Sequence, residues 1–229
     1  MSRMVRRAIL LALSLAAIAL PAAAQLRGTT PSPAQDAATA PAPVQLEGAA
    51  RDQALTQANR ALNALQTLQG HFVQTSPAGR TSGAFYLQRP GKLRFEYDPP
   101  ATMLIVSDGR VVAMRDRALR TTQRTPLNST PLNLILRAQI DLARDARIIR
   151  VVRQGDALFV TAHDRSGQTN GELTMRLDGP ALQLSSWDVV DATGARTHIA
   201  LTGVSSPASL DRRLFQLEDV TEHPSNAPH

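Results

Sequence analysis

The sequence contains no cysteine among its 229 residues. Disulfide bonds, metal sites built on thiolates and cysteine nucleophiles are therefore excluded. No cysteine follows the amino-terminal segment either, so no thiol is present to which a lipid anchor could be attached. This absence argues against a lipoprotein and favours a protein without a covalent membrane anchor.

Aromatic residues and lysine are scarce as well. Aromatic residues make up 3% of the chain, and Lys92 is the only lysine. The other basic residues are arginines that occur singly and without interleaved aromatic residues, which argues against a track for nucleic acid. Removing residues 1–24 removes three arginines and no acidic residue, which lowers the formal net charge from +6 to +3. We expect an ordinary soluble surface and no nucleic-acid partner.

Long apolar runs are absent beyond the amino terminus. Arg3, Arg6 and Arg7 precede an apolar run from Ala8 to Leu20, and small residues follow at Ala22–Ala24. The run has about 13 residues, whereas a membrane-spanning helix needs about 20. This order of features predicts a secretory signal at 1–24, cleaved after about Ala24. An uncleaved amino-terminal anchor is the alternative.

Three further segments follow the predicted signal. Residues 25–47 are rich in proline and alanine and have almost no large apolar side chains, so we expect a disordered linker there. Residues 48–224 have the length of one domain. Residues 225–229 are expected to form a frayed tail.

The folded part begins with a helix and continues with strands. Small and large apolar residues recur at helical spacing and predict a helix that ends near Gly70: Ala54, Leu55, Ala58, Ala61, Leu62, Leu65 and Leu68. Period-two alternation then predicts about ten or eleven antiparallel strands, with a short helix at Pro131–Leu136. A sheet of that length must curl or close, and the helices would cover its concave face. The fold class is mainly β (α+β).

One strand carries a charge on its apolar face. Alternation over Thr81–Arg89 puts Phe85, Leu87 and Arg89 on the same side of the strand. Pro90 and Gly91 then form a corner, and a second strand begins. A buried guanidinium is costly unless acceptors meet its donors. Arg89 therefore either reaches acceptors inside the protein or ends the strand and points to water.

Catalytic constellations are not recognisable. His71, His163 and His198 lie far apart without the spacing of metal ligands. The segment His163–Gly167 contains suitable residue types but predicts a turn rather than an oriented triad. No glycine-rich phosphate loop is present. We expect no enzyme activity, no metal and no cofactor.

The order of motifs resembles the LolA family of periplasmic outer-membrane lipoprotein carriers. The specific part of the resemblance is Arg89-Pro90 with the strand after it and Ser107-Asp108-Gly109. Thr125-Pro126-Leu127 and Pro131–Leu136 follow in the same order as in the family, and the later strands match only in pattern. It extends from about residue 55 to 217. The resemblance implies an incomplete, strongly curved antiparallel barrel with a helical lid over an apolar cavity.

The resemblance also implies roles for individual residues. Arg89 matches the arginine that reaches from the sheet to the lid and holds it closed through hydrogen bonds. Eleven apolar residues are candidates for the lipid cavity, with ordinary core packing as the alternative for each: Phe72, Phe85, Leu87, Leu93, Phe95, Tyr97, Met103, Ile105, Leu132, Ile135 and Leu136.

The function implied by the resemblance is a periplasmic carrier, expected to act as a monomer. It would bind the acyl chains of lipoproteins, accept them from an inner-membrane lipoprotein-releasing ABC transporter and deliver them to an outer-membrane lipoprotein receptor. The alternative is an envelope-stress regulatory protein that senses lipid or mislocalised lipoprotein with a similar half-barrel. A hydrolase is a third possibility, but the sequence displays no nucleophile and base for it.

Overall fold

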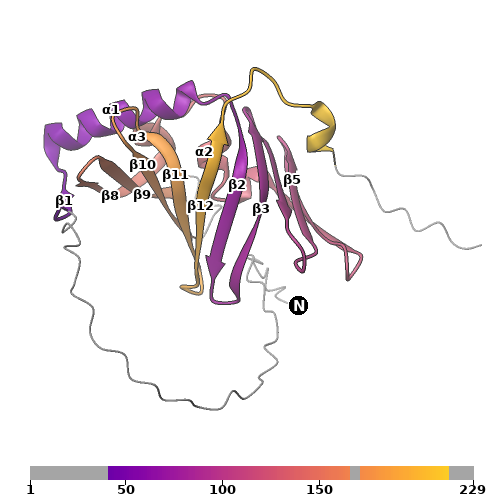
Figure 1. The fold of residues 1–229 in the computed structure, drawn as a ribbon. Helices are drawn as coiled ribbons and strands as arrows, with labels where there is room; N and C mark the ends of the chain where they lie inside the picture. The colour runs from indigo at the N-terminus through magenta and orange to yellow at the C-terminus, as the bar shows by residue number, and fades with distance from the viewer. Residues whose placement is uncertain (1–40, 166–170, 217–229) are drawn as a thin grey trace, which may run out of the picture.

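One open antiparallel sheet of twelve strands dominates the structure (Figure 1). The computed structural model describes residues 41–165 and 171–216. The predicted signal, most of the predicted linker and the predicted tail lie outside these residues. The strand order is β1-β8-β9-β10-β11-β12-β2-β3-β4-β5-β6-β7, and every neighbouring pair is antiparallel. The predicted fold class is confirmed, with slightly more strands than expected.

The strands and helices follow in chain order. They are β1 Val44–Gln45, α1 Gly48–Ala64, β2 Thr67–Ser76, β3 Gly79–Gln88, β4 Lys92–Tyr97, β5 Met103–Asp108, β6 Val111–Asp116, β7 Thr121–Pro126, the 3-10 helix η1 Leu127–Ser129, α2 Asn133–Leu136, α3 Leu142–Asp145, β8 Ala146–Gln154, β9 Ala157–Asp164, β10 Gly171–Asp178, β11 Gln183–Asp191, β12 Arg196–Ser205 and the 3-10 helix η2 Arg212–Phe215.

The sheet curls strongly about its concave face. Strands β4 and β11 are separated by four inter-strand spacings, which would place them roughly 19 Å apart in a flat sheet. Nevertheless the rings of Phe95 on β4 and Trp187 on β11 approach to 6.1 Å between centroids. Side chains from the two halves of the sheet therefore meet across the interior, where the main hydrophobic core lies.

Helix α1 packs on this core and lies across one end of the strands (Figure 1). Its buried residues are Ala54, Leu55, Ala58 and Leu62, as the helical period predicts. The helix ends at Ala64, however, and not near Gly70. Gly70 lies within β2, where an added Cβ would stand 2.8 Å from the carbonyl oxygen of Thr202 on β12. This glycine permits close approach of two strands and does not terminate a helix.

The expected linker extends too far into the domain. Val44 and Gln45 form the edge strand β1, opposite Arg153 and Val152 of β8. The Leu46 amide also donates to the carbonyl of Val151 at 2.8 Å. Main-chain hydrogen bonds order this stretch. A strand of two exposed residues is too short to show an alternating apolar pattern, so the sequence did not predict it.

The outer face of the sheet carries a second, smaller apolar contact. The sequence pattern predicts a last strand at residues 214–217, but Arg212–Phe215 form the 3-10 helix η2 instead. Phe215 is buried, and its ring lies 5.9 Å from the ammonium group of Lys92. Arg94 donates to the carbonyl of Leu214 at 3.2 Å. The segment thus packs on the face of β4 and β5 that points away from α1.

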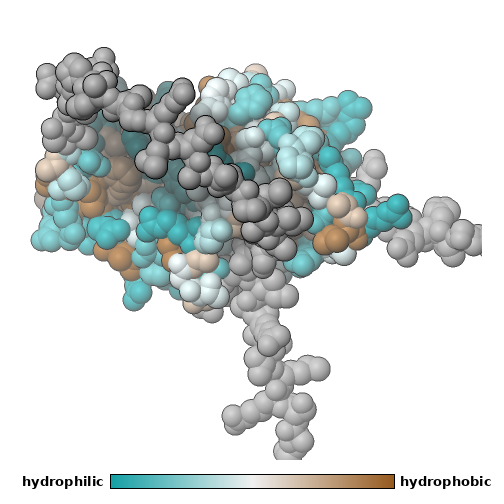
Figure 2. Space-filling view, turned by 60° about the horizontal axis from the view of Figure 1, so that its bottom comes forward, coloured by the Kyte–Doolittle hydropathy of each residue, from teal (hydrophilic) through white to brown (hydrophobic). Residues whose placement is uncertain are grey.

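On the face seen in Figure 2, hydrophilic and hydrophobic residues are interspersed. Within the described ranges, every helix is too short or too polar to cross a membrane.

Candidate functional site

The corner between β3 and β4 places an arginine in the interior. Phe85, Leu87 and Arg89 are buried on the same side of the chain, while the residues between them are partly exposed. Only 6% of Arg89 is exposed. Of the two alternatives for this residue, the structure places the side chain inside, between α1 and the loop after α2.

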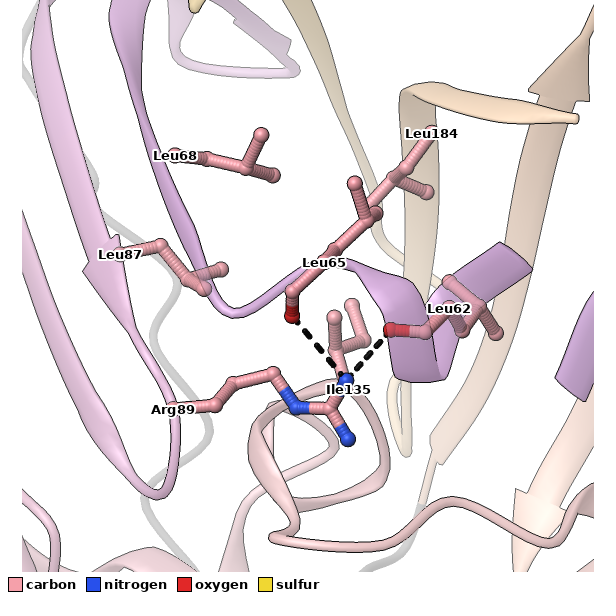
Figure 3. Close-up of a pocket in the computed structure, with 7 residues that line it drawn as sticks. All are labelled: Leu62, Leu65, Leu68, Leu87, Arg89, Ile135 and Leu184. Atoms are coloured by element: carbon pink, nitrogen blue, oxygen red, sulfur yellow. Dashed lines mark hydrogen bonds between the residues drawn. The ribbon is translucent and has the colours of Figure 1, made fainter. Parts of the chain in front are cut away.

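The carboxyl-terminal end of α1 supplies the first set of acceptors. Nη1 of Arg89 donates to the carbonyl oxygens of Leu62 and Leu65, the latter at 3.2 Å (Figure 3). Nη2 donates to the Oδ1 atom of Asn63 at 3.2 Å. The last carbonyls of a helix lack partners within the helix, so a cation that donates to them is well placed.

The loop after α2 supplies the second set. The carbonyl oxygen of Arg137 accepts from Nε of Arg89 at 2.8 Å and from Nη2 at 2.6 Å. The carbonyl of Ala138 accepts from Nη2 at 3.4 Å. Within residues 41–165 and 171–216, no carboxylate forms an ion pair with Arg89, and burial lowers the pKa of its guanidinium. One side chain thus connects β3, α1 and the loop after α2 through neutral acceptors.

Hydrogen bonds of Gly91 and Ser107 stabilise the same corner. The amide of Gly91 donates to the carbonyl of Leu136 at 2.8 Å, and the Ser107 hydroxyl donates to the carbonyl of Gly91 at 2.7 Å. Gly91 has a φ of 76°, and a Cβ there would lie 2.5 Å from the Cα of Gly109. The motifs Arg89-Pro90-Gly91 and Ser107-Asp108-Gly109 therefore meet in space, and Gly91 contacts the end of α2.

Two asparagines of α1 hold the loop after α2, and the sequence analysis missed both. Asn63 accepts from the amide of Ile140 at 2.9 Å and donates to its carbonyl at 2.8 Å. Asn59 accepts from the amide of Leu142 at 3.0 Å. The two residues are four positions apart, so they lie on the same side of α1. Polar residues at this spacing predict such a contact with a loop only weakly. We refer to α1, α2, α3 and the loop between α2 and α3 as the lid.

Asp145 fixes the other side of this loop. Its carboxylate accepts from the amide of Asp141 at 3.0 Å and pairs with Arg144 at 3.0 Å and Arg137 at 3.3 Å. Burial by itself raises the pKa of this carboxyl. The hydrogen bonds from Arg144 and Asp141 and the charges of Arg137 and Arg144 outweigh burial and lower the pKa below the usual range of aspartate.

We expect Asp145→Asn to lower the free energy of unfolding by about 1–3 kcal/mol at neutral pH, because it removes hydrogen bonds to a buried charge. A lowered folded-state pKa contributes stability above the unfolded value of about 3.9, and this stability is lost as pH falls through the folded value. The difference between the variant and the wild type should therefore shrink below about pH 4. Urea unfolding across this range measures it, and a difference independent of pH would contradict the assignment.

A small cavity lies between the lid and the sheet. It has a volume of about 10 Å³ and is lined by Leu62, Leu65, Leu68, Leu87, Arg89, Ile135 and Leu184 (Figure 3). Such a volume is close to the minimum for one water molecule. A larger ligand would fit in this place only after lid and sheet had moved apart.

Two of the eleven candidate cavity residues, Leu87 and Ile135, line this space. The other nine lie in the main core or pack against it: Phe72, Phe85, Leu93, Phe95, Tyr97, Met103, Ile105, Leu132 and Leu136. The helical period predicted Leu62, Leu65 and Leu68 to lie on a helix, and neither these three residues nor Leu184 was predicted to line the cavity.

The three histidines of the catalytic alternative do not come together at this cavity. His163 contacts the carbonyl of Gly171 at 2.8 Å, and His198 contacts Asp188 at 3.2 Å, both on the outer face of the sheet. No group of three or more His, Asp or Glu side chains suited to a metal ion occurs in the described part of the chain.

Comparison with known families gives a match over more than half of the chain. The family described as outer membrane lipoprotein carrier protein LolA matches residues 63–218, which is more than half of the chain. The chain belongs to this family. The match includes the corner at Arg89, the lid loop and the strands up to β12.

Similar proteins carry the same description. The outer-membrane lipoprotein carrier protein of Pseudomonas syringae pv. syringae is 28% identical over 165 residues, covering 67% of this chain and 78% of the relative. That of Chromobacterium violaceum is 28% identical over 178 residues, covering 74% and 85%. A solved LolA superfamily protein from Nitrosomonas europaea aligns with a TM-score of 0.42 at 10% identity, covering 71% of this chain and 97% of that chain.

Proposed function

We propose that this LolA family protein carries lipoproteins across the periplasm by enclosing their acyl chains between the sheet and the lid. The observation that supports this most is the buried Arg89, whose guanidinium joins the sheet to two parts of the lid over an apolar interior. A purely structural core would gain little from a cation at this place. A lid that must open and close again gains a set of hydrogen bonds that form only in the closed state.

The energetics of acyl chains favour such an arrangement. Burying a chain is worth about 0.8 kcal/mol per methylene, so a chain of about 15 methylenes gains roughly 12 kcal/mol. Three fully buried chains would exceed the practical limit of non-covalent affinity, near about 20 kcal/mol. A carrier therefore needs partial burial, or a closed empty state stable enough to compete with cargo. The hydrogen bonds of Arg89 would stabilise that empty state.

A carrier of this kind needs a protein that supplies the lipoproteins and a protein that accepts them. We propose that an ABC transporter of the inner membrane releases lipoproteins to the protein, and that a receptor in the outer membrane accepts them. The predicted cleaved signal fits a periplasmic location, and the missing cysteine fits a carrier without its own lipid anchor. We infer no catalytic step.

Purified protein added to spheroplasts tests the proposal. We expect lipoproteins to appear in the supernatant as soluble complexes with the protein, and no such release with buffer or with an unrelated exported protein of similar charge. Absence of release, together with tight binding to a membrane-anchored regulator, would replace the carrier by the envelope-stress regulator.

A further inference from the structure

The only tryptophan of the chain lies where the two halves of the sheet meet. Trp187 on β11 is 2% exposed, and its ring contacts Phe95 of β4 edge-on at 6.1 Å. Phe95 also contacts Phe72 at 4.7 Å and stacks with Phe85 at 6.2 Å. In a chain with few aromatic residues, most of them gather in this one place.

Trp187 lies on the same strand as one of the residues that line the cavity. Leu184, which lines the cavity, and Trp187 are on the same strand and both face the core, opposite Leu177 and Met175 of β10. The pairing of β10 with β11 shifts register between Arg176 and Leu177. This shift puts Leu184 and Trp187 on the same side of the sheet although they are three positions apart. A chain that enlarges the cavity along β11 would therefore reach the indole ring.

The indole nitrogen is a buried donor without a partner. Its Nε1 atom is inaccessible to solvent, and no hydrogen-bond acceptor within the described residues is in reach. Buried donors are nearly always satisfied, and an unsatisfied one destabilises the state that contains it. By contrast, the hydroxyl of Tyr97 in the same aromatic group donates to Gln74 at 2.7 Å. The described part of the core thus provides a hydrogen-bond acceptor for the hydroxyl of Tyr97 but none for Nε1 of Trp187.

We propose that the Nε1–H of Trp187 donates a hydrogen bond to an acyl carbonyl oxygen of the bound lipid. The inference rests on the proposed carrier function and adds a specificity-determining residue to it. Hydrocarbon binds wherever apolar surface is available, so hydrocarbon contacts alone do not fix the depth at which an acyl chain lies. The ester and amide carbonyls at the head of each acyl chain are the acceptors nearest to that hydrocarbon, and a donor in an otherwise apolar interior fixes how deep the chain lies.

A matched pair of lipids tests this hydrogen bond. The probes are a synthetic lipopeptide with two palmitoyl esters on its glyceryl-cysteine and the analogue with two hexadecyl ethers, which has the same peptide but lacks the two acyl carbonyl groups. Affinities come from displacement of a fluorescent fatty acid, so that variants without tryptophan can be measured. We expect wild type to prefer the ester by roughly threefold to tenfold, the effect of one net hydrogen bond.

Trp187→Phe should abolish this preference, because it keeps an aromatic ring and removes the donor. If this smaller ring perturbs the core, benzothienylalanine in place of Trp187 retains the bicyclic shape without an N–H, and thermal unfolding reports the fold of both variants. A preference that persists in both variants would overturn the inference while leaving the carrier function intact. Failure of wild type to bind either lipid would overturn both.

Discussion

Arg89→Leu should take up lipoprotein cargo but transfer it to acceptor membranes or receptor roughly 100-fold more slowly than wild type. The leucine is apolar and does not obstruct the interior, so uptake from spheroplasts should persist. The measurement is the time course of lipoprotein appearing in the acceptor, started from purified complexes of each protein. The same preparation gives uptake and transfer separately.

The size of this effect follows from the hydrogen bonds that Arg89 donates in the closed state and that leucine cannot form. A hydrogen bond to a charged group contributes about 1.5–3 kcal/mol, and the guanidinium donates to both α1 and the loop after α2. These bonds exist in the closed empty state and break when the lid opens. Losing about 3 kcal/mol from the closed state shifts the balance toward the loaded state by roughly 100-fold. Cargo is then held too tightly.

Arg94→Leu is the matched control. Arg94 lies on the neighbouring strand β4 and is largely buried, but it faces away from the lid and pairs with Glu96 at 3.1 Å. The same change of side chain there removes an ion pair and a hydrogen bond to Leu214 without touching the lid. We expect transfer at the wild-type rate. If Arg89→Leu also transferred at that rate, the guanidinium would have no part in the mechanism.

Local periodicity was enough to predict the parts of the site that lie along one strand or one helix. Alternation in β3 put Phe85, Leu87 and Arg89 on one face, and the helical period identified the buried residues of α1. Both signals depend on neighbours within a few residues in the chain. The resemblance to the LolA family added the expectation that Arg89 faces a lid, which periodicity alone left open.

Contacts between distant parts of the chain could not be predicted in this way. Asn63 bonds to Ile140, 77 residues later, and a polar residue on a helix gives no sign of such a partner. Trp187 meets Phe95 only because the sheet curls through four strand spacings, and sequence predicts that a long sheet curls but not which residues then touch.

Gly91→Ala should lower the free energy of unfolding by about 2–6 kcal/mol. Part of this loss is the cost of a side chain at a φ of 76°, about 1–3 kcal/mol. The rest arises because the new Cβ would stand 2.5 Å from the Cα of Gly109, so one of the two turns must move, at a cost of about 1–3 kcal/mol. Chemical denaturation of purified protein measures the total.

Gly109→Ala separates the two contributions. It also places a side chain at positive φ, 105°, but its Cβ would have no neighbour closer than 3.7 Å. We therefore expect a loss about 2 kcal/mol smaller than that of Gly91→Ala. Displacement of residue 91 also weakens its bonds to Leu136 and Ser107, so only Gly91→Ala should slow cargo transfer. Equal losses of stability and unchanged transfer in both variants would mean that the close contact of the two turns does not position Arg89.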